Sequence, residues 1–224
     1  AKRCSRTLGA TDRPVMQGVD IDRRWAELVA PAADATLAGS VLAKLRQAYG
    51  EPWRHYHTLQ HIQALLGLRI EHAALIRDPE LVDLAILFHD IVYDPRRMDN
   101  EAQSAILARA RLDALGVEPG RIEAVVGLIQ ASKHDTASFD SVDPASDAAV
   151  FLDLDLSILA AERDAYTAYA DQIRREYALY PDPLYRAGRA KVLAGLLARP
   201  ALYCTRALGE RWELPARANL LAEI

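Results

Sequence analysis

The sequence has few of the residues that build extracellular or membrane-spanning scaffolds. Only two cysteines occur among 224 residues, Cys4 and Cys204, near opposite ends and without C-x-x-C spacing. This pattern argues against a disulfide framework or a zinc knuckle and favours a reducing compartment. No stretch approaches the roughly 18 uninterrupted apolar residues of a membrane span, and residues 1–19 lack the apolar core of a secretory signal. We therefore expect a soluble, cytoplasmic protein without membrane association.

Excess positive charge is absent as well. The net charge is -4 and the isoelectric point is about 5.9, so no global field attracts a nucleic-acid polymer or an anionic membrane. Arginine makes up 23 of the 27 basic residues. Arginine suits bidentate phosphate binding, although a general compositional bias is the stronger explanation of the count. Hydrophobic residues form 51% of the chain, which is enough to bury a substantial core.

Alternating strand patterns are nearly absent, and most segments have the apolar spacing of helices. The fold is therefore predicted to be all-α. Residues 1–18 contain glycine and proline without an apolar period and are expected to form a flexible N-terminal arm, followed by a single helical domain over 19–224. The predicted helices cover residues 41–49, 57–68, 79–88, 99–116, 122–129, a pair within 152–177, 185–197, a short one around Leu202 and a final one after Pro215.

Three of the six histidines fall in two tight patterns. His57 and His61 are four residues apart, which on a helix places them on one face. His89 and Asp90 are adjacent and directly follow an apolar run. Neighbouring residues on a regular helix diverge by about 100°, so both can reach one ion only near a helix end, which the following Asp94-Pro95 supplies.

Two aspartates lie in the apolar sequence from Val150 to Leu156. A lone buried carboxylate is very costly, so Asp153 and Asp155 each need a partner, and a cation is the natural one. Nearby arginines such as Arg174 or Arg175 are alternative partners for Asp155. Each pattern alone is common by chance, but the ordered series of a His pair, a His-Asp dipeptide and an aspartate in an apolar helix is not.

These residues resemble the HD superfamily of metal-dependent phosphohydrolases, whose signature is an ordered H…HD…D. The sequence is most similar to a bacterial group of predicted HD phosphohydrolases of unknown substrate, over roughly residues 20–205. The resemblance is carried by the blocks Arg54-His55-Tyr56-His57-Thr58-Leu59-Gln60-His61-Ile62, Phe88-His89-Asp90-Ile91-Val92-Tyr93-Asp94-Pro95, Asp99-Asn100-Glu101-Ala102-Gln103-Ser104-Ala105, Leu152-Asp153-Leu154-Asp155-Leu156-Ser157-Ile158-Leu159 and Ile173-Arg174-Arg175-Glu176-Tyr177. It implies an HD-domain-like helical bundle with additional C-terminal helices, and a divalent cation (Mn, Mg, Fe, Zn, Co or Ni) held by His61, His89, Asp90 and Asp155.

Two blocks also resemble the cyclic nucleotide phosphodiesterases, a distant branch of that superfamily. Tyr56-His57-x-x-x-His61 is similar to a block in which the first histidine is the proton donor and the second a metal ligand. Asp155-Leu156-Ser157 is similar to the block that supplies the last ligand. The resemblance thus implies that His57 is the general acid and that Asp155, rather than Asp153, binds metal. In other HD proteins the ligand histidine precedes Ser or Thr and Leu, which would instead favour His57 as the ligand.

Further residues are candidates to contact the substrate. Arg54, beside the His pair, is the best candidate to stabilise charge on a phosphoryl group, although a structural ion pair is an equal alternative. The other candidates for substrate binding are Asn100, Glu101, His134, Arg174 and Arg189. Capping of a helix is the alternative for Asn100 and Glu101, and a second-shell or second-metal contact is the alternative for His134. His72 lacks any such context and is expected at the surface.

The resemblance implies hydrolysis of a phosphoester, from a nucleotide or another small phosphorylated metabolite, by a metal-activated water. Two other classes remain open, a diiron oxygenase and a non-catalytic ligand-binding or regulatory module. The oxygenase needs more than four ligands, and only His134 and His57 are on offer. The complete ligand set argues against the non-catalytic module. The expected partner is a small phosphorylated substrate, and a homodimer is compatible with these features.

Overall fold

The computed structural model describes residues 18–29, 34–133 and 142–224. In these ranges the chain is all-helical and contains no strand, as the sequence predicts. The arm predicted for residues 1–18 lies, apart from Gly18, outside the described residues. The elements are α1 (Ile21–Val29), α2 (Ala35–Tyr49), α3 (Leu59–Glu71), η1 (Ala73–Leu75), α4 (Pro79–Phe88), α5 (Asn100–Ala114), α6 (Pro119–Ala131), α8 (Asp147–Asp155), η2 (Leu156–Ala160), α9 (Arg163–Glu176), α10 (Asp182–Leu197) and α11 (Arg206–Glu223).

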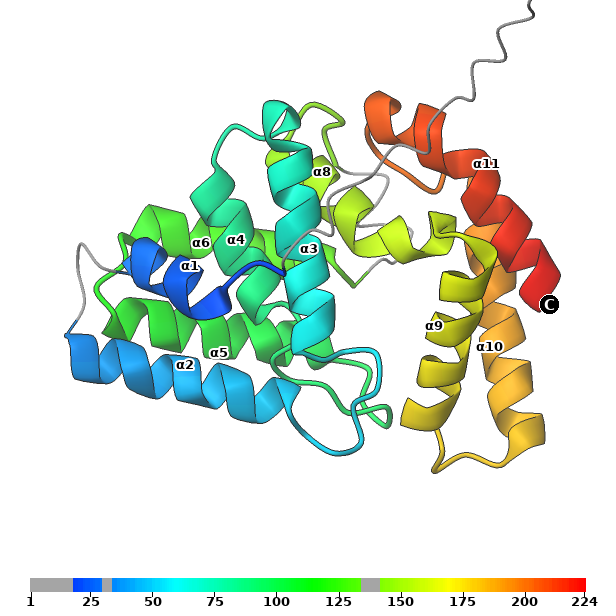
Figure 1. Ribbon diagram of the computed structural model, residues 1–224, viewed down its shortest axis with the longest axis horizontal. Helices are drawn as coiled ribbons and strands as arrows, with labels where there is room; N and C mark the ends of the chain where they lie inside the picture. The colour runs from blue at the N-terminus through cyan, green and yellow to red at the C-terminus, as the bar shows by residue number, and fades with distance from the viewer. Residues whose placement is uncertain (1–17, 30–33, 134–141) are drawn as a thin grey trace, which may run out of the picture.

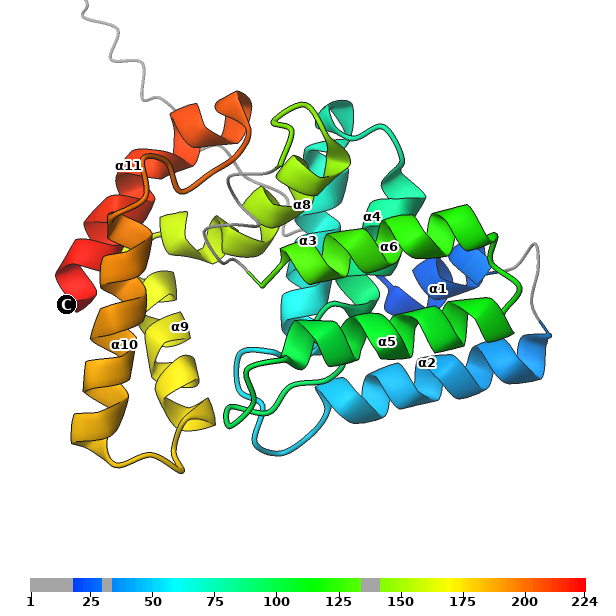
Figure 2. The same cartoon turned by 180° about the vertical axis from the view of Figure 1, so that it is seen from behind.

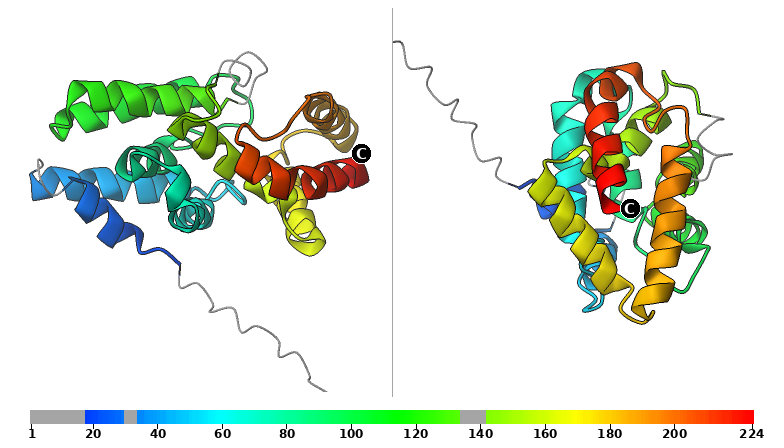
Figure 3. Two further views of the ribbon diagram at one scale, coloured as in Figure 1. Left: turned by 90° about the horizontal axis from the view of Figure 1, so that it is seen from above. Right: turned by 90° about the vertical axis from the view of Figure 1, so that its right-hand side faces the viewer.

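Helix α3 lies between two groups of helices (Figure 1). On one side α4 is surrounded by α3, α5, α6 and α8, and α5 and α6 run side by side in front of it when seen from behind (Figure 2). On the other side stand α9, α10 and α11, which α8 and η2 join to the rest of the molecule (Figures 1 and 3). None of the described helices has both the length and the apolar character needed to cross a bilayer.

Helix α4 is the centre of the core. Asp78 caps its first turn by accepting a hydrogen bond from the backbone N–H of Leu81, and Pro79 occupies a first-turn position where no N–H is needed. Every residue from Val82 to Phe88 is buried. A helix that is apolar on all sides requires neighbours on all sides, and this explains why α4 lies inside the bundle.

One buried carboxylate joins three helices. Asp83 of α4 is fully buried and accepts two hydrogen bonds from Arg69 of α3, both at 2.5 Å, and one from Arg24 of α1. Arg69 is itself buried, so each charge depends on the other for solvation. This ion triad fixes α1 and α3 against the central helix.

The C-terminal helix differs from the prediction. Residues around Leu202 are not helical, and α11 is one continuous helix that passes through Pro215 rather than starting after it. Thr205 starts α11 by accepting a hydrogen bond from the N–H of Leu208. Pro215 is exposed, while Trp212, three residues before it, and Ala216, directly after it, are buried and hold the helix in place.

Replacing Asp83 by Ala should destabilise the protein by about 3–5 kcal/mol, because it leaves Arg69 buried without a counter-charge. Urea unfolding followed by circular dichroism measures this loss. Asp99→Ala is the matched control, since it breaks an exposed pair with Arg97 and should leave stability near that of the wild type. Equal unfolding midpoints for the two variants would contradict a stabilising role for the triad.

Candidate metal centre

Three helix ends meet at the candidate ligands. His61 lies in the first turn of α3, His89 and Asp90 directly follow the end of α4, and Asp155 is the last residue of α8. The expectation that His89 and Asp90 lie at a helix end is confirmed. The C-terminal ends of α4 and α8 both present partial negative charge, which favours a cation between them.

The ligand atoms converge from these three elements. His89 Nε2 lies 2.9 Å from Asp90 Oδ2, 3.5 Å from Asp155 Oδ1 and 3.4 Å from His61 Nε2. His61 Nε2 lies 3.4 Å from Asp155 Oδ1 and 3.9 Å from Asp90 Oδ2. Of the described residues, His61, His89 and Asp90 form the group whose ligand atoms all lie within 4.8 Å of one another. The structure thus brings together the four residues predicted as ligands.

These separations fit a single ion. Nitrogen and oxygen ligands lie about 2.0–2.2 Å from a transition metal, so at right or tetrahedral angles they stand about 2.8–3.6 Å from one another. Four of the five measured separations fall in this range. Both imidazoles are buried, whereas the side chains of Asp90 and Asp155 retain 16% and 13% exposure. The carboxylate side of the centre is therefore the side that solvent reaches.

Hydrogen bonding orients one imidazole for coordination. The Nδ1–H of His89 donates to the carbonyl of Ile86 at 2.9 Å, because a carbonyl can only accept. In the neutral ring, Nε2 then carries a lone pair that faces His61 and both carboxylates. A ligand histidine held by a backbone carbonyl in this way is typical of metal sites.

The charges around the centre also favour a cation. Burial alone would lower the pKa of His89, but Asp90 and Asp155 outweigh it and raise that pKa well above its ordinary value. At His61 burial prevails and the pKa is lowered, so this ring is neutral. Two carboxylates beside two imidazoles therefore need positive charge between them, and a divalent cation supplies it. The donor set fits such an ion.

The structure corrects the placement of His57. Helix α3 begins at Leu59, because Thr58 caps it by accepting a hydrogen bond from the N–H of Gln60, so His57 lies in the preceding loop and not on one helical face with His61. The two rings are nevertheless neighbours, with centroids 6.0 Å apart. His57 Nδ1 donates to Glu176 Oε2 at 2.7 Å, so His57 is tied to a carboxylate outside the cluster.

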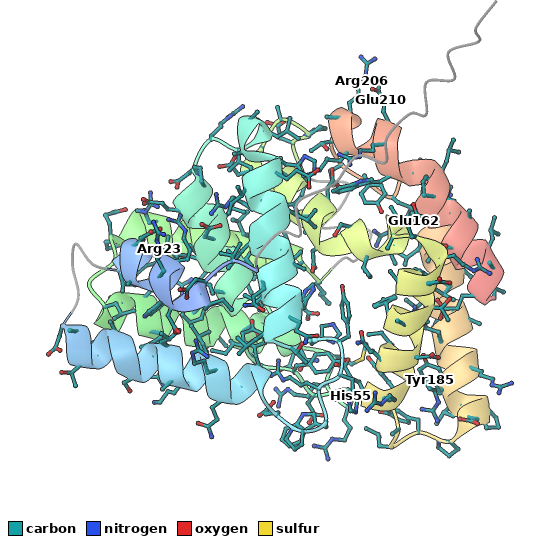
Figure 4. All side chains as sticks on the ribbon, in the orientation of Figure 1. Arg23, His55, Glu162, Tyr185, Arg206 and Glu210 are labelled. Atoms are coloured by element: carbon teal, nitrogen blue, oxygen red, sulfur yellow. The ribbon has the colours of Figure 1, made fainter. Side chains whose placement is uncertain are left out.

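Glu176, at the end of α9, was not assigned a role from sequence. Its Oε1 accepts the backbone N–H groups of His55, Tyr56 and His57 at 2.7, 2.8 and 3.0 Å, and its Oε2 also accepts the hydroxyl of Tyr93. Burial alone would raise the pKa of Glu176, but the hydrogen bond and charge of the His57 ring, with the backbone N–H groups of His57 and His55, lower it to about 2. Figure 4 places His55 at the foot of α3 beside α9. In the sequence, Glu176 stands in one of the blocks that resemble the HD superfamily. That block does not reveal its partners, which are distant in the sequence.

Arg54 also fixes the loop before α3, through hydrogen bonds of its guanidinium group. Its guanidinium donates to the carbonyls of Asp90 at 2.6 Å and Ile91 at 3.0 Å and to Glu51 at 2.9 Å, and the side chain is buried. These contacts join the loop before α3 to the segment after α4. Arg54, expected to contact a phosphoryl group, is therefore placed as a positioning residue.

The other residues predicted to contact the substrate lie in different parts of the structure. The side chain of Asn100 bridges the N–H and carbonyl of Asp94 and shapes the loop next to the centre. Arg174 pairs with Asp182, and Arg189 pairs with Glu223. Glu101 lies in the first turn of α5, and His134 lies outside the described residues. His72, expected at the surface, is partly buried against Trp212 because it ends α3 under α11.

Asp153 and Asp155 have separate roles. Asp153 is fully buried and accepts hydrogen bonds from the N–H of Cys204 and from the N–H and hydroxyl of Thr205. Burial raises its pKa to about 6 in spite of these donors. It faces the start of α11, whereas Asp155 faces the histidines. The structure therefore separates the two carboxylates in the way that the resemblance implies.

Comparison of the chain with protein-family models, with curated proteins and with solved structures finds no match.

Replacing His89, Asp90 or Asp155 by Ala should abolish binding of about one equivalent of transition metal while preserving helicity. Asp153→Ala is the matched control: it should keep the metal and lose stability by about 1–3 kcal/mol, because it leaves buried backbone donors unpaired. Elemental analysis and urea unfolding measure the two effects. Full metal content in Asp155→Ala, with loss in Asp153→Ala, would reverse the assignment.

Proposed function

We propose that this protein is a metal-dependent phosphohydrolase of the HD type, which cleaves a small phosphoester with a water activated at the metal centre. The observation that carries the proposal is the convergence of His61, His89, Asp90 and Asp155 beside a third histidine, His57, that is held by its own carboxylate. The resemblance of the sequence blocks to the HD superfamily supports the same reaction class.

Each residue of the centre has a separate task. His61 and His89 offer imidazole nitrogens, and Asp90 and Asp155 offer carboxylate oxygens on the side that solvent reaches. When bound, a divalent cation there would activate a water and polarise a phosphoryl oxygen. Two carboxylates and two neutral nitrogens leave coordination positions for both of these oxygens, as in other catalytic sites.

In the proposed reaction, His57 protonates the leaving oxygen. Glu176 engages its Nδ1, which leaves Nε2 as the nitrogen that can serve a substrate. The carboxylate stabilises the protonated ring, and Tyr93 stacks on the ring with centroids 4.2 Å apart. The same carboxylate fixes the backbone at His57, so ring and loop are oriented together. Catalysis of this kind requires a fixed donor close to the reacting group.

His61→Ala and His57→Ala should fail in different ways. His61→Ala should lose metal and activity together. His57→Ala should keep its metal and lose turnover by about 10²–10⁴-fold, the usual effect of a positioned general acid. Metal content and the hydrolysis rate of phosphoester substrates measure both. Metal lost in His57→Ala but retained in His61→Ala would exchange the two roles.

The defect of His57→Ala should depend on the leaving group. It should shrink for p-nitrophenyl esters, because p-nitrophenolate needs little protonation, and stay large for alkyl phosphoesters. A defect of equal size for both would remove the acid role even if the metal stays bound. Metal-dependent oxygen uptake without release of phosphate would favour the oxygenase over the hydrolase.

Glu176→Gln should lower turnover by about 10- to 100-fold without loss of metal. The amide keeps the volume of the side chain and can accept the backbone N–H groups, but it removes the charge that stabilises protonated His57. In a His57→Ala background the same substitution should have little further effect, since both then act on one step. Additive losses in the double variant would show that Glu176 acts independently of His57.

A further inference from the structure

Helix α10 is almost uncovered by the rest of the described chain. Only Leu193 of its 16 residues is buried, and Figure 2 shows the helix at the outer edge of the molecule. It packs against α11, and Arg174 of α9 lies over the ring of Tyr185. Most of the surface of α10 therefore faces away from the molecule.

The outward face of α10 lacks the charged side chains of a solvated helix. Between Ala187 and Gly195 seven residues are exposed, and Lys191 is the one among them that carries a charge. The large apolar side chains of Leu184 and Val192 are 59% and 55% exposed. The exposed face of a helix is ordinarily polar, and an apolar face of this kind marks a surface that contacts another protein.

Two glycines lie within this face. Glycine in the interior of a helix is less favourable than alanine, so Gly188 and Gly195 weaken α10 on its own. A Cβ at either position would meet no described atom within 4 Å, apart from the adjacent residues and the backbone of the helix itself. The described fold therefore does not require glycine there. The missing side chains would matter instead to a helix that approaches α10 from outside.

The glycines alternate with larger side chains at the spacing of a coiled-coil seam. Leu184, Gly188, Lys191 and Gly195 are separated by four, three and four residues, and at 100° per residue they lie opposite the buried Leu193. Consider two copies of α10 that run antiparallel about a two-fold axis at the midpoint of the helix. Leu184 of each copy then lies against Gly195 of the other. Lys191 of each copy lies against Gly188 of the other, so the face is complementary to itself.

We propose that α10 is the contact surface of a homodimer, in which it pairs antiparallel with α10 of a second copy. A parallel pair would place leucine against leucine and glycine against glycine. The antiparallel direction also brings the N-terminal end of each helix beside the C-terminal end of the other, and the partial charges of these ends attract. The helix is about 24 Å long, so the seam is short and predicts a reversible, concentration-dependent dimer. None of the candidate metal ligands lies on this face, and the proposal does not depend on the proposed function.

Sedimentation equilibrium of the full chain from about 1 µM to about 1 mM tests the pairing. The mass should rise with concentration toward twice 24.7 kDa. Gly188→Leu should fold, because its side chain meets open space within one copy, but it should weaken dimerisation at least about tenfold by colliding with the partner helix. Gly39→Leu is the matched control, since Gly39 is an exposed glycine of α2 that also has no described neighbour within 4 Å, and it should dimerise like the wild type.

Paired cysteines test the direction of the helices. Leu184→Cys and Gly195→Cys in one chain should give a disulfide-linked dimer with oxidised glutathione. Either single variant should not, because equivalent positions are eleven residues, or about 16 Å, apart along the antiparallel pair. A disulfide-linked dimer of Leu184→Cys alone would contradict the antiparallel pairing. A mass that stays monomeric up to about 1 mM, or undiminished dimerisation of Gly188→Leu, would overturn the assignment of α10 as the interface.

Discussion

The arrangement of this protein depends on negative charge gathered where several helices end. Asp90 and Asp155 lie at the C-terminal ends of α4 and α8, where the helices carry partial negative charge, and their two largely buried carboxylates add to that charge. Repulsion between these groups would oppose folding unless something positive lies between them. The two carboxylates answer to this in part by raising the pKa of the neighbouring His89 imidazole well above its ordinary value, which favours its positively charged form. The bundle therefore brings together a set of groups that a metal ion would stabilise.

The loops around this cluster are held by buried ionic side chains that bind main-chain groups. Arg54 donates to carbonyls on the segment after α4, and Glu176 accepts three successive N–H groups from the loop before α3. Each satisfies backbone groups that would otherwise be buried without a partner. The cost of burying these charges is thus offset by hydrogen bonds that also fix the positions of Asp90 and His57.

Sequence patterns predicted much of this structure, but not all of it. The all-helical class and the end of α4 at His89 follow from apolar spacing and the Asp94-Pro95 stop, whereas the set of four candidate ligands, with Asp155 rather than Asp153, came from the resemblance to the HD superfamily. The role of Glu176 did not follow, because its partners are about 120 residues away and no local pattern encodes them. Arg54 and Arg189 were judged by charge and proximity in sequence, whereas their actual partners, backbone carbonyls and Glu223, depend on the tertiary fold.

The course of α11 is a second feature that the sequence did not predict correctly. A proline inside a helical pattern usually ends the helix. Here Pro215 is exposed, and the buried residues before and after it in the sequence, Trp212 and Ala216, keep the helix continuous. The packing of α11 therefore outweighs the low helix propensity of proline. Capping also moved the start of α3 by two residues, which separated His57 from the helix while leaving the two rings close.

The long sequence separation between His57 and Glu176 bears on the order in which the chain is made. All four candidate ligands are complete once synthesis has passed Asp155, whereas the carboxylate that orients His57 follows about twenty residues later, and α11, which Asp153 holds, comes last. Contacts so distant in sequence form slowly, because a long loop must close before they stabilise anything. On the proposed function, a nascent chain would therefore possess the four candidate ligands before the carboxylate that orients His57 is in place, and the proposed reactivity would be acquired only as α9 docks.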